Sequence, residues 1–199
     1  MKPDASAPAT AEDTFDAVFA IRLPPRPYPG LRPFEQHEWP IFFGRERMTD
    51  EIVERLLGLR LLVVHGDSGC GKSSLVRAGV LPRLEQESAR GGVRWRTCTA
   101  LPRAAPLWNL AHALAALDTP GEGDADALEA RTIAFRRALN FGREAPTALA
   151  ELLGCGPRNQ VCILVDQFEE LFEHARRHGP EEATLLAAME GAGKLVHDE

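Results

Sequence analysis

Apolar residues recur every three or four positions over several stretches of the chain, which is the spacing of amphipathic helices. The first such stretch begins after Gly44 and ends near Gly58. It predicts a helix whose apolar face is formed by Met48, Ile52, Val53, Leu56 and Leu57. The same spacing predicts further helices over residues 106–117, 128–140, 146–153 and 181–190.

Three shorter segments have the patterns of β-strands. Residues 61–65 are a short apolar run, Leu-Leu-Val-Val, that ends at His65. Residues 161–165 are a continuous apolar run, as expected for a strand that is buried on both faces of a parallel sheet. Residues 93–99 instead alternate between apolar and polar side chains. Because helical patterns separate these strands, we predict an α/β domain in which helices flank a parallel sheet.

The first apolar run leads into a glycine-rich turn followed by a helical pattern. Residues 66–73 read Gly-Asp-Ser-Gly-Cys-Gly-Lys-Ser, which matches the phosphate-binding pattern G-x-x-x-x-G-K-S/T. Glycines let successive backbone N–H groups turn inward toward phosphate oxygens. Lys72 would reach the β- and γ-phosphates, and the Ser73 hydroxyl would ligate Mg²⁺. The predicted nucleotide contacts in this loop are Gly66, Asp67, Ser68, Gly69, Cys70, Gly71, Lys72, Ser73 and Ser74. The following helix should be disturbed at Pro82.

The last apolar run ends in a carboxylate. Asp166 follows residues 161–165, at the end of a strand where α/β sheets bind ligands. This is the pattern of a Walker B strand, and Asp166 would hold Mg²⁺ opposite Ser73 through water. Glu169 and Glu170 follow in the first turn of a predicted helix, where either one could orient or deprotonate an attacking water. Favourable charge at a helix N-terminus explains them equally well.

Prolines and aromatic residues gather before the first helix. The prolines of residues 27–34 exclude a helix and predict an extended segment with turns. Four aromatic residues follow closely in a chain that is only 7% aromatic: Phe34, Trp39, Phe42 and Phe43. They would pack in the core or form one wall of an adenine pocket.

Composition narrows the class of protein. With 199 residues, 44% hydrophobic and 26% charged, the chain fits one globular domain, residues 28–199, after a flexible tail or linker, residues 1–27. The net charge of −6 gives no indication of a nucleic-acid partner, and no apolar run approaches bilayer length. Four cysteines without C-x-x-C spacing fit a reducing compartment, so we predict a cytoplasmic location.

Four ordered motifs together resemble the bacterial novel STAND NTPases, signal-transduction P-loop ATPases often coupled to WD-type or tetratricopeptide repeats. These are residues 27–34, residues 42–46 (Phe-Phe-Gly-Arg-Glu), the loop with its helix at 66–82, and residues 165–172. The resemblance implies that Gly44 and Arg45 lie near the adenine. By analogy with the related NACHT ATPases, it favours Glu169 over Glu170 as the catalytic acid, acting with Lys72.

The resemblance also implies a sensor strand, a helical lid and a winged-helix region, none of which follows residue 199. We therefore expect a domain truncated before the sensor strand, in which residues 61–65 and 161–165 lack their shared neighbour and leave backbone groups unpaired. The implied function is an ATP-binding switch with slow Mg²⁺-dependent hydrolysis. Its partners would be ATP, ADP and proteins bound through the absent repeats, with a nucleotide-dependent oligomer possible. No guanine-reading N-K-x-D pattern is visible, which favours ATP over GTP. The alternatives are a non-enzymatic interaction module, a fragment with weak or no turnover and, less favoured, a small-molecule kinase.

Overall fold

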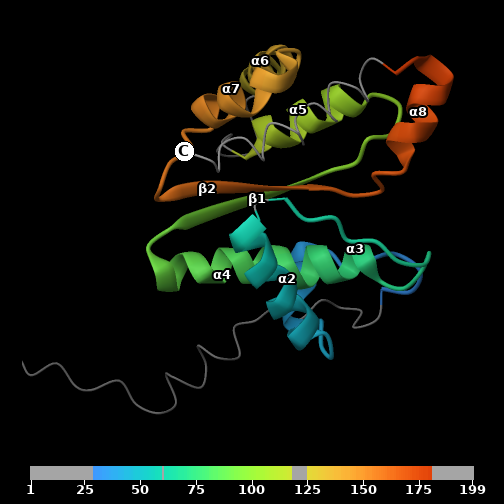
Figure 1. Cartoon of the computed structure of the whole chain (residues 1–199), viewed down its shortest axis with the longest axis vertical. Helices are drawn as coiled ribbons and strands as arrows, with labels where there is room; N and C mark the ends of the chain where they lie inside the picture. The colour runs from blue at the N-terminus through green and yellow to red at the C-terminus, as the bar shows by residue number, and fades with distance from the viewer. Residues whose placement is uncertain (1–28, 60, 118–124, 181–199) are drawn as a thin grey trace, which may run out of the picture.

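A pair of parallel strands forms the centre of the domain. The computed structural model describes residues 29–59, 61–117 and 125–180. Strand β1 (Arg94–Ala100) pairs with β2 (Asn159–Val165) in a register that runs from Arg94 opposite Asn159 to Ala100 opposite Val165. Helices lie on both sides of this pair (Figure 1). The predicted α/β fold with a parallel sheet flanked by helices is thereby confirmed.

A helical crossover joins the two strands. It consists of α5 (Pro106–Ala116), α6 (Ala125–Leu139), the 3₁₀ turn η3 (Gly142–Glu144) and α7 (Ala145–Leu152). Parallel strands need such a connection because the chain must return from the end of β1 to the start of β2. The helical patterns of residues 106–117, 128–140 and 146–153 predicted these three helices to within a few residues.

Side chains alternate along β1 and β2, so each strand contributes to two apolar clusters, one on each face of the strand pair. Cys98 and Ala100 of β1 belong to a buried apolar cluster with residues of α5, α6 and α7, and Ile163 of β2 packs against it. Trp95 of β1 and Cys162 of β2 pack against a smaller cluster on the opposite face. This smaller cluster consists of Val53, Val80 and Leu84. Every residue of β2 nevertheless keeps partial exposure, so the prediction of a fully buried strand at 161–165 is wrong. Within the described residues β2 pairs on one side only.

Helix α2 (Glu46–Leu59) and one long helical run cover the second face. The run consists of α3 (Lys72–Ser74), the π-helical turn η2 (Leu75–Val80) and α4 (Leu81–Gly91). The disturbance predicted at Pro82 occurs just before it. Pro82 has no N–H to offer the carbonyl of Ala78, and the N–H of Leu81 bonds to the carbonyl of Val76, five residues back.

The buried stripe of α2 is narrower than its apolar pattern suggested. Thr49 and Val53 are buried, and Ile52 packs against the smaller core. Met48 and Leu57 belong to the predicted apolar face, but they are 44% and 49% exposed. The covered stripe is the one that faces η2 and α4, the elements against which α2 packs most closely.

The strand predicted at residues 61–65 does not form. This segment has no helical or strand pairing, and Leu61 and Val63 are 43% and 72% exposed. An apolar run becomes a strand only when a neighbour satisfies its backbone groups, and no described strand lies beside this one. Within the described residues, 61–65 have no strand partner, and β2 pairs with β1 along its whole length on one side.

The aromatic-rich segment is fastened by a charged clasp. Residues 29–34 contain a turn and no helix, as predicted, and the extended residue Glu35 leads into the 3₁₀ helix η1 (Gln36–Ile41). The guanidinium of Arg32 donates to both carboxylate oxygens of the buried Glu38, each at 2.7 Å. We call this pair the Glu38 clasp. It lowers the pKa of Glu38 to about 2.

The four aromatic residues have different surroundings. Phe34 and Phe42 stack edge to face with centroids 5.5 Å apart, while Trp39 and Phe43 are 44% and 75% exposed. Phe34 and Phe42 are thus half-buried against each other, outside the two core clusters. The predicted tail at residues 1–27 and the predicted helix at 181–190 lie outside the described residues. In the part of the chain that is described, no helix is both long and apolar enough to cross a membrane.

Candidate functional site

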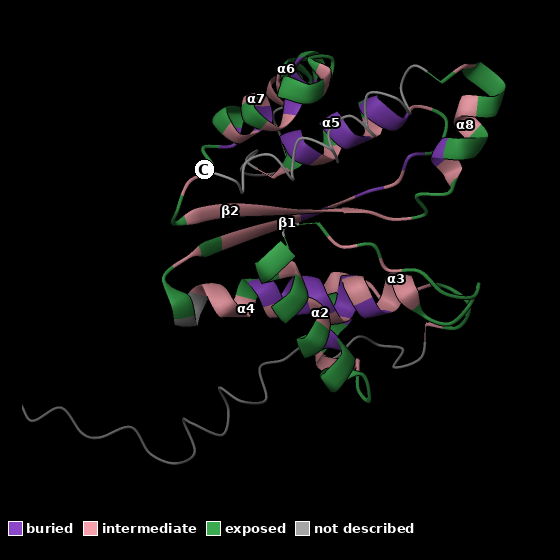
Figure 2. Cartoon of the chain, in the orientation of Figure 1, coloured by how far each residue is buried: buried purple, intermediate pink, exposed green. Residues whose placement is uncertain are grey.

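The glycine-rich loop forms an exposed turn that leads into α3. Gly69 and Gly71 have φ of 80° and 89°, the left-handed region that side chains rarely adopt. A Cβ at either position would meet nothing within 4 Å, so backbone conformation and not crowding requires glycine here. Residues 66–71 are all exposed (Figure 2). The loop therefore borders open space on the side from which a ligand would approach.

The fold brings Ser73 and Asp166 into contact across 93 positions of sequence. The Ser73 hydroxyl donates to Oδ1 of Asp166 at 2.9 Å. The backbone N–H of Asp166 donates to the carbonyl of Ala100 at 3.0 Å, which extends the pairing of β1 and β2 by one residue. Gln167 follows with a φ of 56°, and its N–H donates to the same Oδ1 at 2.9 Å. The end of β2 thus holds the carboxylate against the start of α3.

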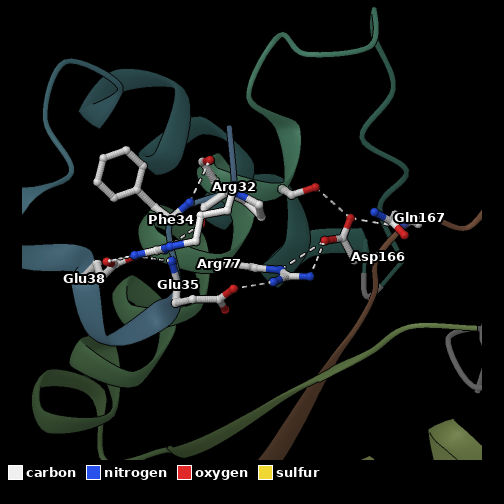
Figure 3. Close-up of polar contacts among 10 residues, drawn as sticks. Arg32, Phe34, Glu35, Glu38, Arg77, Asp166 and Gln167 are labelled. Carbon is white, nitrogen blue, oxygen red and sulfur yellow. Dashed lines mark hydrogen bonds and ion pairs between the residues drawn. The ribbon is translucent and has the colours of Figure 1, made fainter. Parts of the chain in front are cut away.

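Arg77 is a part of this cluster that the sequence analysis missed. Its Nε and Nη2 donate to Oδ2 of Asp166 at 3.0 and 2.8 Å, and its Nη1 donates to Oε1 of Glu35 at 2.8 Å (Figure 3). Arg77 is only 9% exposed. Its spacing of four residues from Ser73 places both on one face of the helical run, a signal that the sequence does contain.

The Lys72 ammonium lies over the loop. It donates to the carbonyls of Gly66 and Asp67, both at 2.9 Å. The side chains of Asp67, Ser68 and Cys70 are exposed. The Ser74 hydroxyl turns away from the loop and accepts the N–H of Phe34 at 3.1 Å.

Gly44 and Arg45, which were predicted to lie near the adenine, have different surroundings. Nη2 of Arg45 reaches the carbonyl of Cys70 at 3.5 Å, which places this side chain beside the loop. Gly44 instead donates its N–H to Oε1 of Glu46 at 2.8 Å, at the start of α2. The structure therefore brings Arg45 to the loop, and it gives Gly44 a local bond at a helix start.

The two candidate acids also differ. Glu170, the first residue of α8 (Glu170–His178), accepts the N–H of Arg103 at 2.8 Å and so joins α8 to the segment after β1. Arg103 has a positive φ of 48°. Glu169 immediately precedes α8 and is exposed. The carboxylate of Glu170 is thus engaged in a hydrogen bond between two segments of the fold, whereas Glu169 is exposed to solvent.

The donor set of the site fits a magnesium nucleotide. A serine hydroxyl and a carboxylate are hard oxygen ligands, and Mg²⁺ is bound in proteins by one or two such groups together with substrate phosphates. Oδ1 of Asp166 faces the Ser73 hydroxyl, while Arg77 occupies Oδ2. The exposed glycine turn and the N-terminus of the long helical run supply N–H groups suited to phosphate oxygens.

Comparison with known proteins agrees with this geometry. Residues 27–196 match the family described as Novel STAND NTPase 1. Searches of curated proteins and of solved structures found no match. The matched range contains the loop, Asp166 and the segment with the Glu38 clasp, and it covers far more than half of the chain. The chain therefore belongs to the Novel STAND NTPase 1 family, as its motifs predicted.

Proposed function

We propose that this domain binds ATP together with Mg²⁺ and serves as a signal-transduction switch that slow hydrolysis resets. The observation that carries the proposal is the 2.9 Å contact between the Ser73 hydroxyl and Asp166. It joins the end of the phosphate-binding pattern to the carboxylate at the end of β2. Membership of an NTPase family supports the same conclusion.

Each part of the site has a distinct role in this proposal. The N–H groups of the loop from Gly66 to Ser74 would hold the phosphates, and Lys72 would exchange its bonds with the loop carbonyls for bonds with phosphate oxygens. Ser73 and Asp166 would hold Mg²⁺, which supplies positive charge next to the phosphates. Arg45 would lie on the side of the loop where the base binds. Gly44 would also lie near the base, but its local bond to Glu46 supports this role less strongly.

We assign the orientation of the attacking water to Glu169. It is exposed and lies three residues after Asp166, whereas Glu170 is occupied by the N–H of Arg103. Phosphate release by the purified chain tests this assignment. Turnover should disappear in Asp166→Asn and Glu169→Gln. Glu170→Gln should instead lower the melting temperature and leave most of the turnover.

A second candidate is nucleotide binding without turnover, in a domain that acts through its surfaces. The bond between Glu170 and Arg103 favours it, because it ties one of the two candidate acids to a structural role. A parent protein that binds ATP but releases no phosphate above the level of Asp166→Asn would select this candidate.

The binding test uses Lys72→Ala in calorimetry with ATP and Mg²⁺. A charge-assisted hydrogen bond contributes about 1.5–3 kcal/mol, so the dissociation constant should rise roughly 10- to 100-fold. Arg55→Ala is the matched control, because Arg55 is also a cation but is exposed and pairs with Glu51 within α2. If Lys72→Ala binds ATP as tightly as the parent, the assignment of the loop is wrong.

The switch itself requires that ATP and ADP favour different arrangements of the protein. We propose a cytoplasmic protein with protein partners and an oligomeric state that depends on the nucleotide. Size-exclusion chromatography with light scattering, in ATP with Mg²⁺ and then in ADP with Mg²⁺, should give different masses. Equal masses in the two nucleotides would remove oligomerisation from the proposal.

A further inference from the structure

The carboxylate of Asp166 has its two oxygens bound by different groups. Oδ1 accepts from the Ser73 hydroxyl and from the N–H of Gln167, each at 2.9 Å. Oδ2 accepts twice from one guanidinium, through Nε of Arg77 at 3.0 Å and Nη2 at 2.8 Å. Two donors from one rigid, planar group restrict the rotation of the carboxylate. Oδ1 is thereby left facing Ser73.

This ion pair lies largely inside the protein. The side chains of Arg77 and Asp166 are 10% and 11% exposed. Water therefore screens their attraction less than it would at the surface. Removal of the guanidinium would leave a shielded carboxylate with a hydroxyl and one backbone N–H, both on the same oxygen. Oδ2 would then be free to rotate toward Ser73 or toward solvent.

The third donor of Arg77 connects the site to the aromatic-rich segment. Nη1 donates to Glu35 at 2.8 Å, and the adjacent N–H of Phe34 donates to the Ser74 hydroxyl at 3.1 Å. Consecutive residues of this segment thus contact the helical run at Ser74 and Arg77, on either side of Leu75 and Val76. Figure 3 shows Arg77 between Glu35 and Asp166.

We infer that Arg77 is a positioning residue that orients the Asp166 carboxylate for the metal and links this carboxylate to Glu35. The inference rests on the proposed binding of a magnesium nucleotide, and it assigns to Arg77 an effect on the metal that passes through Asp166. Partners of ligating carboxylates have such an effect in other sites, where their removal weakens metal affinity by about 10- to 100-fold.

A purely structural role for Arg77 makes a different prediction. If the ion pair only fastened β2 to the helical run, its removal would lower the melting temperature and leave the effect of metal on folded protein unchanged. The two roles separate in the ratio of nucleotide affinities with and without metal. We therefore take as the readout the affinity for a fluorescent methylanthraniloyl ATP in Mg²⁺, divided by the affinity in EDTA.

The experiment compares Arg77→Met with Arg83→Met. Arg83 lies on the same helical run and pairs with Asp50 and Glu87, so its variant also loses an ion pair. Arg77→Met should lower the ratio of the affinity in Mg²⁺ to the affinity in EDTA, which we call the metal-dependent gain, about tenfold. It should leave the affinity in EDTA near that of the parent, because the loop and Lys72 are intact. Arg83→Met should keep the parent ratio.

Two further variants keep the test decisive. Arg77→Lys retains the charge but not the planar set of donors, so it should restore less than half of the lost gain. If Arg77→Met is unfolded by circular dichroism, Arg77→Lys decides. Glu35→Gln should reduce the gain by a smaller factor than Arg77→Met, because the bonds from Arg77 to Asp166 remain.

The inference is overturned if folded Arg77 variants show the parent ratio while Asp166→Asn has lost the gain. A parent ratio in Asp166→Asn as well, or no binding of the fluorescent nucleotide by the parent, would instead overturn the proposed function. The two failures are therefore distinguishable.

Discussion

The contact between α2 and η2 depends on the absence of a side chain at Gly79. A Cβ at this position would lie 2.6 Å from Oγ1 of Thr49, well inside ordinary van der Waals contact of 3.4–4 Å. The ring of Phe42 would be 3.4 Å away and Cγ2 of Thr49 3.5 Å away, so rotating the threonine exchanges one close atom for another. Thr49 is buried, at 7% exposure. We predict that Gly79→Ala forces α2 away from the helical run that follows the glycine-rich loop.

Two opposing terms determine the magnitude. Extra methyl groups in packed cores cost about 1–3 kcal/mol. Alanine in place of glycine inside a helix contributes up to about 1 kcal/mol in favour of folding. Gly58→Ala isolates the second term, because Gly58 also lies in a helix, has no positive φ and would place its Cβ in open space. The free energy of unfolding of Gly79→Ala should therefore fall below that of Gly58→Ala by roughly 1–3 kcal/mol.

Urea unfolding of both variants measures this difference, and each kcal/mol should also shift the melting temperature by about 2–4 °C. Thr49→Ala removes both close atoms of the threonine. The double variant Gly79→Ala/Thr49→Ala should thus recover stability relative to the sum of the single changes, with a coupling of about 0.5–3 kcal/mol. Equal stability of the two glycine variants, or additive effects in the double variant, would refute the close contact.

Two further predictions concern ionisable groups. The clasp lowers the pKa of Glu38 from 4.5 to about 2. Its contribution to the free energy of unfolding is therefore present above pH 4.5 and is lost as pH falls toward 2. The unfolding free energy of Glu38→Gln should approach that of the parent over this range in urea titrations, and a constant gap would contradict the clasp. Burial raises the pKa of Cys98 to about 12 and of Cys162 to about 11, so in a thiol-reagent assay only the exposed Cys70 and Cys155 should react rapidly before denaturation. Bound Mg²⁺-ATP should protect Cys70 alone, and equal protection of Cys155 would argue against binding at the loop.

Two kinds of sequence relationship bring the side chains of the Arg77 cluster together. One is local, since Ser73 and Arg77 are four residues apart on one helical run. The other comes from distant segments, Asp166 at the end of β2 and Glu35 before η1, which meet the run only in the folded protein. A variant that loosens either distant segment should change the contacts of Asp166 without altering the loop itself.

The amino-acid sequence by itself determined the features that depend on neighbouring residues. Helical spacing predicted α2 and the crossover helices, and alternation predicted β1. The chemistry of the phosphate-binding pattern and of a carboxylate after an apolar run identified Ser73 and Asp166 as partners. These signals are local, since periodicity and loop chemistry are properties of consecutive residues.

Tertiary structure decided which segments pair and which polar groups meet. Residues 61–65 have the pattern of a strand, but pairing needs a neighbour, and β1 pairs with β2. Met48 is exposed although it belongs to an apolar pattern, because only one stripe of α2 is covered. Arg77 bonds to Asp166 across 89 positions, and Glu170 is taken up by Arg103 across 67. These two contacts depend on how distant segments of the chain pack together, and the motifs did not predict them.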